Sequence, residues 1–448
     1  MKLPVWQLRV YLLASWRLTF PMLVIMGFDV LINLTDTLIA GMLGKQTQAA
    51  VGVANQTYFV FTFIVNAVTV GTIAVISRIA TSPNKKRELP PAVYTAVYFA
   101  SVISLVITVI AGVSAPLILK NINLAPQVQS EAVSLAVFYN LGLFFHLMTI
   151  LFNGILRAVG LISVSMRVMV LTACINIALN FILVFFTPLH FIGIALSTSA
   201  SWLVAFVLTG AAALRLSGGK SLRRFSKDIM MKVANISWPS AVVMFSWQFS
   251  SFAVFYIIAK LPEGSVETMA ALTAGLRIES IIFMPAFAFN MANAVTVGNF
   301  LGEDKPNEAF NAAFATALCS VAAVTLITAC VLLFSSPIAY LLASKDMGGT
   351  PNPEVYREIV TYLKIIMLSE PLVAAHLAFG GALAGAGDTK SIMKYTLVSL
   401  WVVRIPLVYL LGITFEGGAI GVWWAMNLTF VSQACFSAIR FFSKKWMA

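Results

Sequence analysis

A few ionisable and amide side chains lie deep inside long apolar runs of the sequence. Asp29 and Asp36 are seven residues apart, so on a helix they would share one face about two turns apart. Asn176 and Asn180 are one helical turn apart, and their carboxamides can bond to a protonated Asp or to an ion. A carboxyl group shielded from water can take up and release a proton near neutral pH. The pattern favours cation coupling, with helix–helix contact as the alternative for the asparagines.

The coupling ion stays open between a proton and Na⁺. Carboxylate and amide oxygens are also suitable ligands for a hard cation. Asp36, Asn176 and Asn180 are therefore also a candidate Na⁺ site, and no other metal site is predicted.

A second group of deep charges lies in the C-terminal half of the chain and consists of Glu279, Glu370 and Arg404. Each such residue costs about 2.5–3.5 kcal/mol at the centre of a membrane helix on insertion scales, so its default interpretation is functional. The alternative is an internal ion pair, in which Arg404 neutralises either glutamate and only fixes helix packing. The sequence leaves both interpretations open.

Pro21 lies 15 residues before Asp36 in the same apolar run. A proline inside a helix removes a backbone hydrogen bond and can kink the helix. A kink on a helix that carries a titratable Asp would allow a bend driven by ion binding. The alternative is a static kink.

Composition excludes several classes of protein. Of the 448 residues, 60% are hydrophobic and only 10% are charged, whereas a soluble domain carries roughly 25% charged residues. The net charge of +12 falls in short clusters between apolar runs, which indicates cytoplasmic loops and not nucleic-acid binding. The sequence contains no motif for ATP binding, for a hydrolase triad or for a zinc protease. We therefore expect that the protein is not an enzyme, that it uses no cofactor and that its energy comes from an ion gradient.

The chain reads as an all-α membrane protein of twelve transmembrane helices. Most of the 29 Lys and Arg residues fall on one side if both termini are cytoplasmic. We therefore expect a multi-pass protein of the inner cell membrane, with the lipid bilayer as its surroundings. The expected spans are 12–43, 50–80, 91–119, 129–157, 163–187, 190–215, 233–260, 267–301, 308–343, 355–384, 391–412 and 418–442.

Two segments recur in the same order in the two halves. Gly154–Gly160 is similar to Gly381–Gly387, and Phe20-Pro21 is similar to Trp238-Pro239. Six spans per half give both halves the same direction through the membrane, hence a parallel pseudo-two-fold repeat. The predicted domains are an N-terminal lobe (1–216), a cytoplasmic linker (217–232) and a C-terminal lobe (233–448). Transporters use two such lobes around a central site.

These segments together resemble multidrug and toxic compound extrusion (MATE) transporters. The segment Asp36–Gly44, preceded by Pro21, resembles the family's first helix. The segment Arg277–Gly302 resembles the family's eighth helix and the loop after it. Glu370–Thr389 and Arg404–Leu407 resemble its tenth and eleventh helices. The resemblance covers nearly the whole chain.

The resemblance implies a secondary active multidrug efflux transporter. It would export organic cations or amphipathic toxic compounds in antiport with protons or sodium, by alternating access, with Asp36 as the main coupling residue. The family's polar pair on the fifth helix maps onto Asn176 and Asn180, although some members carry an Asp at the latter position; Asp29 could substitute for it. Where other members have a seventh-helix Glu, the nearest polar residue is Gln248, which cannot titrate.

Two rival functions remain from the sequence. One is a lipid-linked precursor flippase of the same superfamily, which would want a basic cavity, whereas the deep residues are mostly acidic. The other, more distant, is an ion channel, which usually assembles around a symmetric filter. We expect a monomer that binds small cationic or amphipathic substrates and no nucleic acid. The identity of the substrate and the role of Glu279 and Glu370 are left open.

Overall fold

The structure is a computed structural model that describes residues 5–122, 124–218, 224–343 and 352–447. These residues are predominantly helical and contain no strand, which confirms the predicted all-α class. Ten helices in this part of the chain are long and apolar enough to cross a membrane, or eleven if one bent pair counts as a single span. The chain is therefore a multi-pass membrane protein, and the total of twelve spans stays a prediction.

The first half of the chain contains α1 (Val5–Leu43), α2 (Lys45–Thr81), α3 (Lys85–Asn121), α4 (Pro126–Ala158), α5 (Ile162–Phe185) and α6 (Ile192–Arg215). The second half begins with α7 (Lys227–Ile258), α8 (Ser265–Gly302), α9 (Pro306–Leu333), α10 (Ser335–Leu342), α11 (Pro353–Ile366) and α12 (Glu370–Gly385). It ends with α13 (Thr389–Leu397), the π-helix η2 (Val398–Arg404), α14 (Ile405–Tyr409), the π-helix η3 (Leu410–Thr414) and α15 (Gly418–Phe442).

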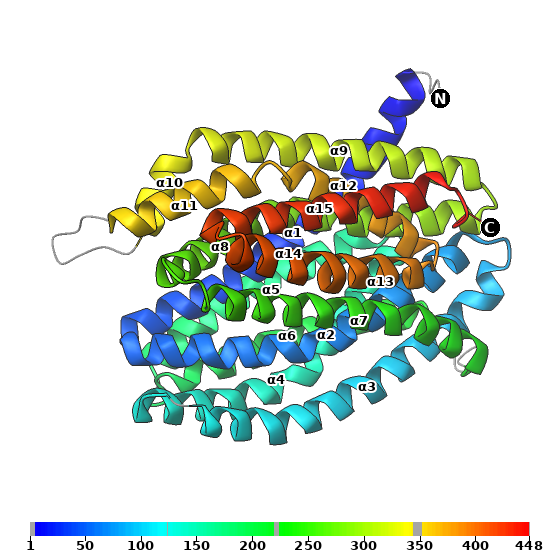
Figure 1. The fold of residues 1–448 in the computed structure, drawn as a ribbon. Helices are drawn as coiled ribbons and strands as arrows, with labels where there is room; N and C mark the ends of the chain where they lie inside the picture. The colour runs from blue at the N-terminus through cyan, green and yellow to red at the C-terminus, as the bar shows by residue number, and fades with distance from the viewer. Residues whose placement is uncertain (1–4, 123, 219–223, 344–351, 448) are drawn as a thin grey trace. The chain divides into compact units, whose positions relative to one another are not determined.

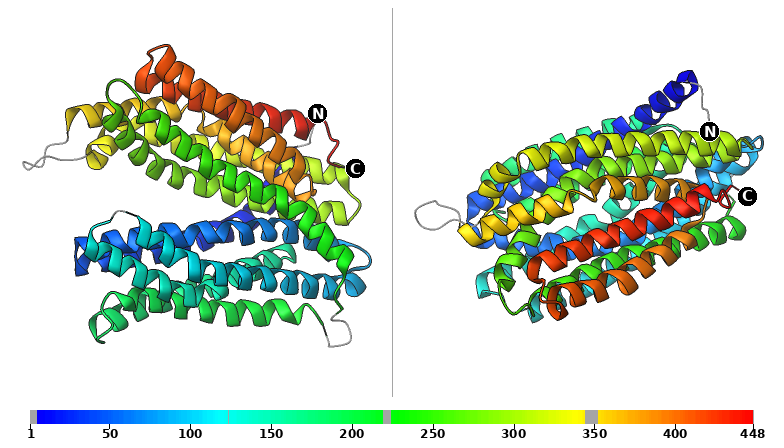
Figure 2. Two further views of the ribbon diagram at one scale, coloured as in Figure 1. Left: turned by 60° about the horizontal axis from the view of Figure 1, so that its bottom comes forward. Right: turned by 45° about the horizontal axis from the view of Figure 1, so that its top comes forward.

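The helices form two compact units, which Figures 1 and 2 show as ribbons. The N-terminal unit is Phe20–Ala241, and the C-terminal unit is Met1–Thr19 together with Val242–Ala448. In the N-terminal unit α4 packs against α2, α3 and α6, and α6 also packs against α5. In the C-terminal unit α8 packs against α9, α11 and α12, and α12 packs against α15.

The limits of these units differ from the predicted lobe limits at 216 and 233. Two long helices, α1 and α7, begin in one unit and end in the other, so the chain changes unit inside a helix and not in the linker. Pro21 and Pro239, the prolines of the internal repeat, lie within three residues of these two changes. Each crossing helix therefore carries a proline, the residue that weakens a helix most, close to its change of unit.

Three predicted segments are less regular than expected. The segment 308–343 is two helices, α9 and α10, which meet at Phe334. The segment 355–384 consists of α11 and α12, which are bent by 51° at the break between them; Pro371 in the first turn of α12 lacks the N–H that would continue a helix. The segment 391–412 is interrupted by η2 and η3. Sequence hydropathy does not register such breaks because the residues around them remain apolar.

The repeated glycine segments have the same backbone conformation. Gly160 after α4 and Gly387 after α12 both have positive φ, 83° and 86°. In each case the next residue donates its N–H to a carbonyl five residues earlier, Leu161 to Leu156 and Asp388 to Leu383, both at 2.8 Å. This is the hydrogen bond of a Schellman cap, which requires a left-handed residue. The sequence repeat therefore corresponds to a structural repeat.

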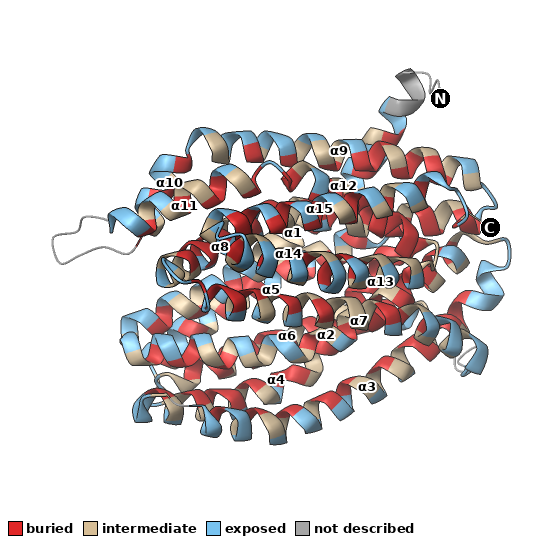
Figure 3. Cartoon of the chain, viewed as in Figure 1, coloured by how far each residue is buried: buried red, intermediate tan, exposed pale blue. Residues whose placement is uncertain are grey.

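The outer helices have an exposed face, and Figure 3 shows exposed residues in pale blue along α3. Leu105, Val109 and Val113, which follow one another at a spacing of one turn, are 58%, 60% and 62% exposed. A continuous apolar face of this kind is unfavourable in water and suits the hydrocarbon of a bilayer.

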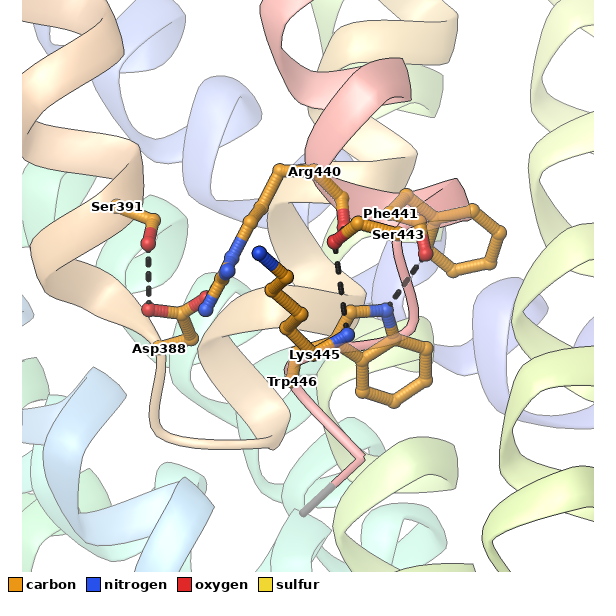
Figure 4. Close-up of polar contacts among 7 residues, drawn as sticks. All are labelled: Asp388, Ser391, Arg440, Phe441, Ser443, Lys445 and Trp446. Atoms are coloured by element: carbon orange, nitrogen blue, oxygen red, sulfur yellow. Dashed lines mark hydrogen bonds and ion pairs between the residues drawn. The ribbon is translucent and has the colours of Figure 1, made fainter.

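Residues near both ends of the chain contact the N-terminal part of α9, inside the C-terminal unit. The Tyr11 hydroxyl donates to Glu308 in the first turn of α9, and the Lys444 ammonium lies 4.8 Å from the centre of the Phe310 ring. Figure 4 shows the adjoining contacts: the Trp446 indole donates to the Phe441 carbonyl at 2.9 Å.

The same figure shows an ion pair nearby, in which Nε of Arg440 lies 2.6 Å from Oδ2 of Asp388. It joins the end of α15 to the residue that precedes α13. These contacts anchor the C-terminal residues on the unit.

Candidate functional site

Four polar side chains of the N-terminal unit form a closed ring of hydrogen bonds. The Asn180 amide donates to Oδ1 of Asp36 at 2.8 Å and to Oδ1 of Asn176 at 3.1 Å. The Asn176 amide donates to the Thr198 hydroxyl at 3.0 Å. The Thr198 hydroxyl in turn donates to Oδ2 of Asp36 at 2.8 Å, which closes the ring. The structure thus brings together three residues that the sequence predicted, Asp36, Asn176 and Asn180.

The packing of three helices places the ring. Asp36 comes from the last two turns of α1, the two asparagines come from one face of α5, and Thr198 comes from the second turn of α6. Because α5 and α6 pack against each other along the unit, Thr198 faces the asparagines. Asn176 and Asn180 are fully buried, and Asp36 is 2% exposed.

The carboxylate of Asp36 has only neutral hydrogen-bond donors. Among the described residues, the ion pairs are Lys305 with Glu303 and Arg440 with Asp388, and neither involves Asp36. A buried carboxylate needs a counter-charge or a proton, because hydrogen bonds from amides and a hydroxyl do not cancel its charge. The ring can therefore bind a proton or a small cation from outside the chain.

The ring also holds an unused oxygen. Oδ1 of Asn180 is buried and accepts no hydrogen bond from the described residues. Together with the carboxylate of Asp36, the amide oxygen of Asn176 and the hydroxyl of Thr198, it makes a set of neutral and anionic oxygens that suits a hard cation. No group of three or more His, Cys, Asp or Glu side chains in the described residues has metal-site geometry.

Thr198 is the member of the ring that the sequence did not point out. Its signal is weak: it lies in Ser197-Thr198-Ser199, a short polar run within an apolar helix. Serine and threonine in membrane helices usually bond to their own backbone. Only the register of α6 against α1 shows that this hydroxyl bonds to a carboxylate instead.

Asp29 lies outside the ring. Its side chain is half-buried, and no described residue forms a hydrogen bond or ion pair with its carboxylate. The prediction that Asp29 shares a helix face with Asp36 fits the continuous α1, but two turns separate the residues. The structure does not bring Asp29 together with the other residues predicted for coupling.

Pro21 lies inside α1, beside the change from the C-terminal to the N-terminal unit. Its place on the helix that carries Asp36 is thus as predicted. Whether the helix bends there during function stays a prediction.

The second predicted group gathers in the C-terminal unit. Glu279 on α8 accepts a hydrogen bond from the Tyr362 hydroxyl on α11. Glu370 is fully buried at the start of α12, and neither of its carboxyl oxygens has a hydrogen-bond partner among the described residues. Glu370 and Arg404 both interact electrostatically with Glu279. The three predicted charges therefore surround one region of this unit.

Arg404 does not form a direct ion pair with either glutamate, since the described ion pairs lie elsewhere. Its guanidinium group lies 5.5 Å from the centre of the Trp247 ring, and its Nε and Nη1 have no acceptor in the described chain. Arg404 is the last residue of η2, and π-helical turns occur frequently at functional sites. The neighbouring Gln248 is half-buried and forms no hydrogen bond with these residues.

The two halves of the chain each match a known sequence pattern. The sequence model of the MatE family matches residues 21–182 and 239–410, two segments that begin at the repeated prolines. The chain belongs to the MATE family. Because both halves match, the family assignment agrees with the repeat and with the two compact units.

Relatives of this MATE protein span nearly its whole length. It is 24% identical over 430 residues to a probable multidrug resistance protein NorM of Thermotoga maritima, which covers 93% of this chain and 89% of the relative. It is 25% identical over 421 residues to an uncharacterized transporter, YisQ, of Bacillus subtilis, with 92% and 90% covered.

Solved structures of transporters share the fold of this protein. A multidrug resistance MATE transporter in an outward-facing conformation superimposes with a TM-score of 0.87 at 19% identity, over 97% of both chains. A transporter of the MOP superfamily from Pyrococcus furiosus, whose binding pocket is described as having reverse polarity, superimposes with a TM-score of 0.85 at 19% identity over 97% of both chains. Identity this low shows a shared fold and does not transfer a substrate.

Proposed function

We propose that this MATE protein exports organic cations or amphipathic toxic compounds in exchange for protons or sodium ions. The observation that carries the proposal is the ring around Asp36: a buried carboxylate that only neutral donors contact. Multidrug resistance in the names of several relatives supports the class of cargo. The ring supports the source of energy, because it has to be neutralised from outside the chain.

Binding of an ion to the ring can change how α1 is held against its neighbouring helices. When Asp36 is charged, the donated hydrogen bonds of Asn180 and Thr198 hold the end of α1 against α5 and α6. When a proton binds, the carboxyl group loses its charge and one oxygen becomes a donor, so the hydrogen bonds from Asn180 and Thr198 lose the charge that strengthens them. The position of α1 then depends on whether the ion is bound. A bend at Pro21 would convert this change into loss of cargo from the N-terminal unit.

Sodium would act on the same side chains in a different way. It would draw the oxygens of Asp36, Asn176 and Asn180 toward one point, with the amide groups rotated to present oxygen. In either case one ion binds at the carboxylate of Asp36. The two ions are separated by which gradient drives transport.

The C-terminal group is a second candidate for coupling. Glu370 has no hydrogen-bond partner and Arg404 has two N–H groups without an acceptor in the described chain, which is unusual for groups that only fix packing. We assign Glu279 and Glu370 a function in binding a proton, with Tyr362 as the hydrogen-bond donor that orients Glu279.

The proposal includes an orientation in the inner cell membrane with both termini in the cytoplasm. The distribution of Lys and Arg supports it. The contacts of Tyr11 with Glu308 and of Lys444 with Phe310 support the placement of both termini on one side of the membrane, because they hold residues near both ends of the chain at one end of α9.

Transport in proteoliposomes tests the proposal. Efflux of ethidium is measured under an imposed pH gradient and, separately, under an imposed sodium gradient. We expect one of the two gradients to drive transport in the wild type and Asp36→Asn to reduce it to the level of empty liposomes. Asp304→Asn, the same change at an exposed loop residue, is the matched control. Undiminished gradient-driven transport by Asp36→Asn, or ethidium transport that neither gradient drives, contradicts the proposal.

A further inference from the structure

We propose that Asp29, Tyr58, His146 and Trp202 form the site that binds the positively charged, aromatic part of the cargo, separate from the ring around Asp36. The inference rests on the proposed function and divides the two acidic residues of α1 between two tasks. Asp36 binds the coupling ion, and Asp29 provides the counter-charge for an organic cation.

The proposed site lies one to two helical turns away from the ring around Asp36, along the same helices. On α6, Trp202 follows Thr198 by one turn, and on α4, His146 follows Tyr139 by two turns. Thr198 bonds to Asp36 and Tyr139 interacts with it electrostatically, so both belong to the level of the ring. Trp202 and His146 contact each other and therefore form a second level.

The first half of α1 reaches this second level. Ile25, one turn before Asp29 on the same face, packs against the cluster that contains Trp202. Asp29 interacts electrostatically with the Tyr58 hydroxyl. Because α1 runs antiparallel to α6, Asp36 lies at the level of Thr198 while Asp29 lies toward the level of Trp202.

Three aromatic side chains from three helices meet at this level. The His146 ring stacks on Trp202 with centroids 3.9 Å apart and an angle of 15° between the planes. The Tyr58 hydroxyl lies 3.0 Å from Nδ1 of His146, and the Tyr58 ring is nearly parallel to the imidazole, at 7°. The hydrogen bond and the stacking hold the three rings in a fixed arrangement, which is a pre-formed flat surface.

The charge next to these rings is available. Both carboxyl oxygens of Asp36 accept hydrogen bonds, whereas the described residues provide neither a hydrogen bond nor an ion pair for the carboxylate of Asp29. Asp29, Tyr58 and His146 are only half-buried, so a ligand can reach them, whereas Trp202 is 5% exposed and supports the His146 ring from behind. A free carboxylate beside ordered aromatic faces is the combination that binds aromatic and quaternary cations.

The alternative site in this unit is too small for a cargo. A cavity lined by Tyr58, Tyr139, Thr57, Asn140 and Leu143, among others, has a volume of about 10 Å³. This is room for about one water molecule. This cavity therefore does not compete with the half-buried surface of Tyr58 and His146 for an organic cation.

Equilibrium binding to the purified full-length protein in nanodiscs tests the inference. The probes are methyltriphenylphosphonium and its neutral analogue triphenylphosphine oxide, which present similar phenyl groups with and without a charge. We expect Asp29→Asn to weaken binding of the cation about tenfold or more, as for loss of a partly buried charge partner, and to leave binding of the neutral analogue within about twofold. Asp29→Glu, which keeps the charge, should restore most of the affinity for the cation.

Asp36→Asn is the comparison that separates the two acidic residues. Because asparagine resembles the neutral form of Asp36, this variant should bind both probes more weakly and by the same factor, whereas Asp29→Asn weakens only the cation. Unchanged binding of the cation by Asp29→Asn, or a loss that is selective for the cation in Asp36→Asn and not in Asp29→Asn, overturns the inference while leaving gradient-driven transport by the wild type in place. If the wild type binds the cation through Asp29 but neither gradient drives transport, the proposed function is overturned instead.

Discussion

The Thr198 hydroxyl lies 2.8 Å from Oδ2 of Asp36, although 162 positions separate the two residues in the chain. This hydroxyl also accepts a hydrogen bond from Asn176 at 3.0 Å. Thr198 is therefore the link that connects the acidic residue on α1 to the asparagines on α5 by a second route, beside the direct bond from Asn180. A single hydroxyl makes the difference between an open chain of hydrogen bonds and a closed ring.

Replacing Thr198 by valine tests this link, since valine has nearly the same shape without the hydroxyl. The change leaves the Asn176 amide and one oxygen of Asp36 unpaired in a buried place, which costs about 1–3 kcal/mol. We expect the apparent affinity for the coupling ion, measured from the ion dependence of ethidium transport, to change by about fivefold or more. Thr198→Ser, which keeps the hydroxyl, should behave like the wild type. Equal ion dependence in the valine and serine variants would show that the ring does not need this bond.

Exchanging the two side chains of one bond tests the importance of α1. The double variant Asp36→Asn with Asn180→Asp moves the carboxylate from α1 to α5 and keeps the composition of the ring. The hydrogen bonds can reverse direction, because amide groups can rotate, so we expect the ring to form and the ion to bind. Transport should nevertheless fail, since the charge no longer lies on the helix that contains Pro21.

The measurement for this exchange combines two assays. Ion binding is followed by ion-dependent thermal stabilisation of the purified protein, and transport is followed in proteoliposomes. Stabilisation close to that of the wild type with transport at background fits the proposal. Coupled transport by the exchanged variant would mean that the position of the carboxylate within the ring is irrelevant.

Sequence patterns predicted the helices and part of the ring for clear physical reasons. Long apolar runs have few alternatives to helix in a membrane, and the spacing of Asn176 and Asn180 places both amides on one face whatever the surroundings. Their contact with Asp36 could be predicted only from the resemblance to a family, because residue spacing within one helix does not determine its register against another helix. The contact of Thr198 with Asp36 could be identified only in the structure.

The C-terminal unit contains helix irregularities that the hydropathy of the sequence does not predict. The break between α11 and α12 places Glu370 at the first position of a helix and not in its middle. The π-helix η2 shifts the register of Arg404. The direct ion pair that the sequence left open is not formed among the described residues, although the three charges lie in one region.

Replacing Glu370 by glutamine distinguishes a coupling role from a structural one. Glutamine has the shape of a neutral carboxylic acid, so a glutamate that binds and releases a proton should be replaced with little loss of stability and a large loss of transport. A structural counter-charge for Arg404 predicts the opposite, because a buried guanidinium left alone costs about 3–5 kcal/mol. We expect the first result, with thermal unfolding close to the wild type and transport reduced about tenfold or more. Strong destabilisation with residual coupled transport would assign Glu370 to packing.

The close packing of α12 against α8 is tested by Gly381, the first residue of the repeated segment, and by its neighbour Gly380. A Cβ at Gly381 would overlap the backbone carbonyl of Asn290, which cannot move without shifting α8, whereas a Cβ at Gly380 would have its nearest neighbour at 3.7 Å, an ordinary contact. We expect Gly381→Ala to destabilise the protein by about 1–3 kcal/mol through overpacking. Gly380→Ala should be neutral or stabilise it by about 0.5–1 kcal/mol, since alanine is the better helix former.

Thermal unfolding of both variants in the same detergent is the measurement, with ethidium transport as the second readout. Because α8 also carries Glu279, a shift of that helix at Gly381 should lower transport as well as stability, while the Gly380 variant keeps both. Equal unfolding temperatures for the two variants would mean that the helices do not approach as closely in the membrane. The pair differs by one position and by no chemistry, so any difference reports the distance between α8 and α12.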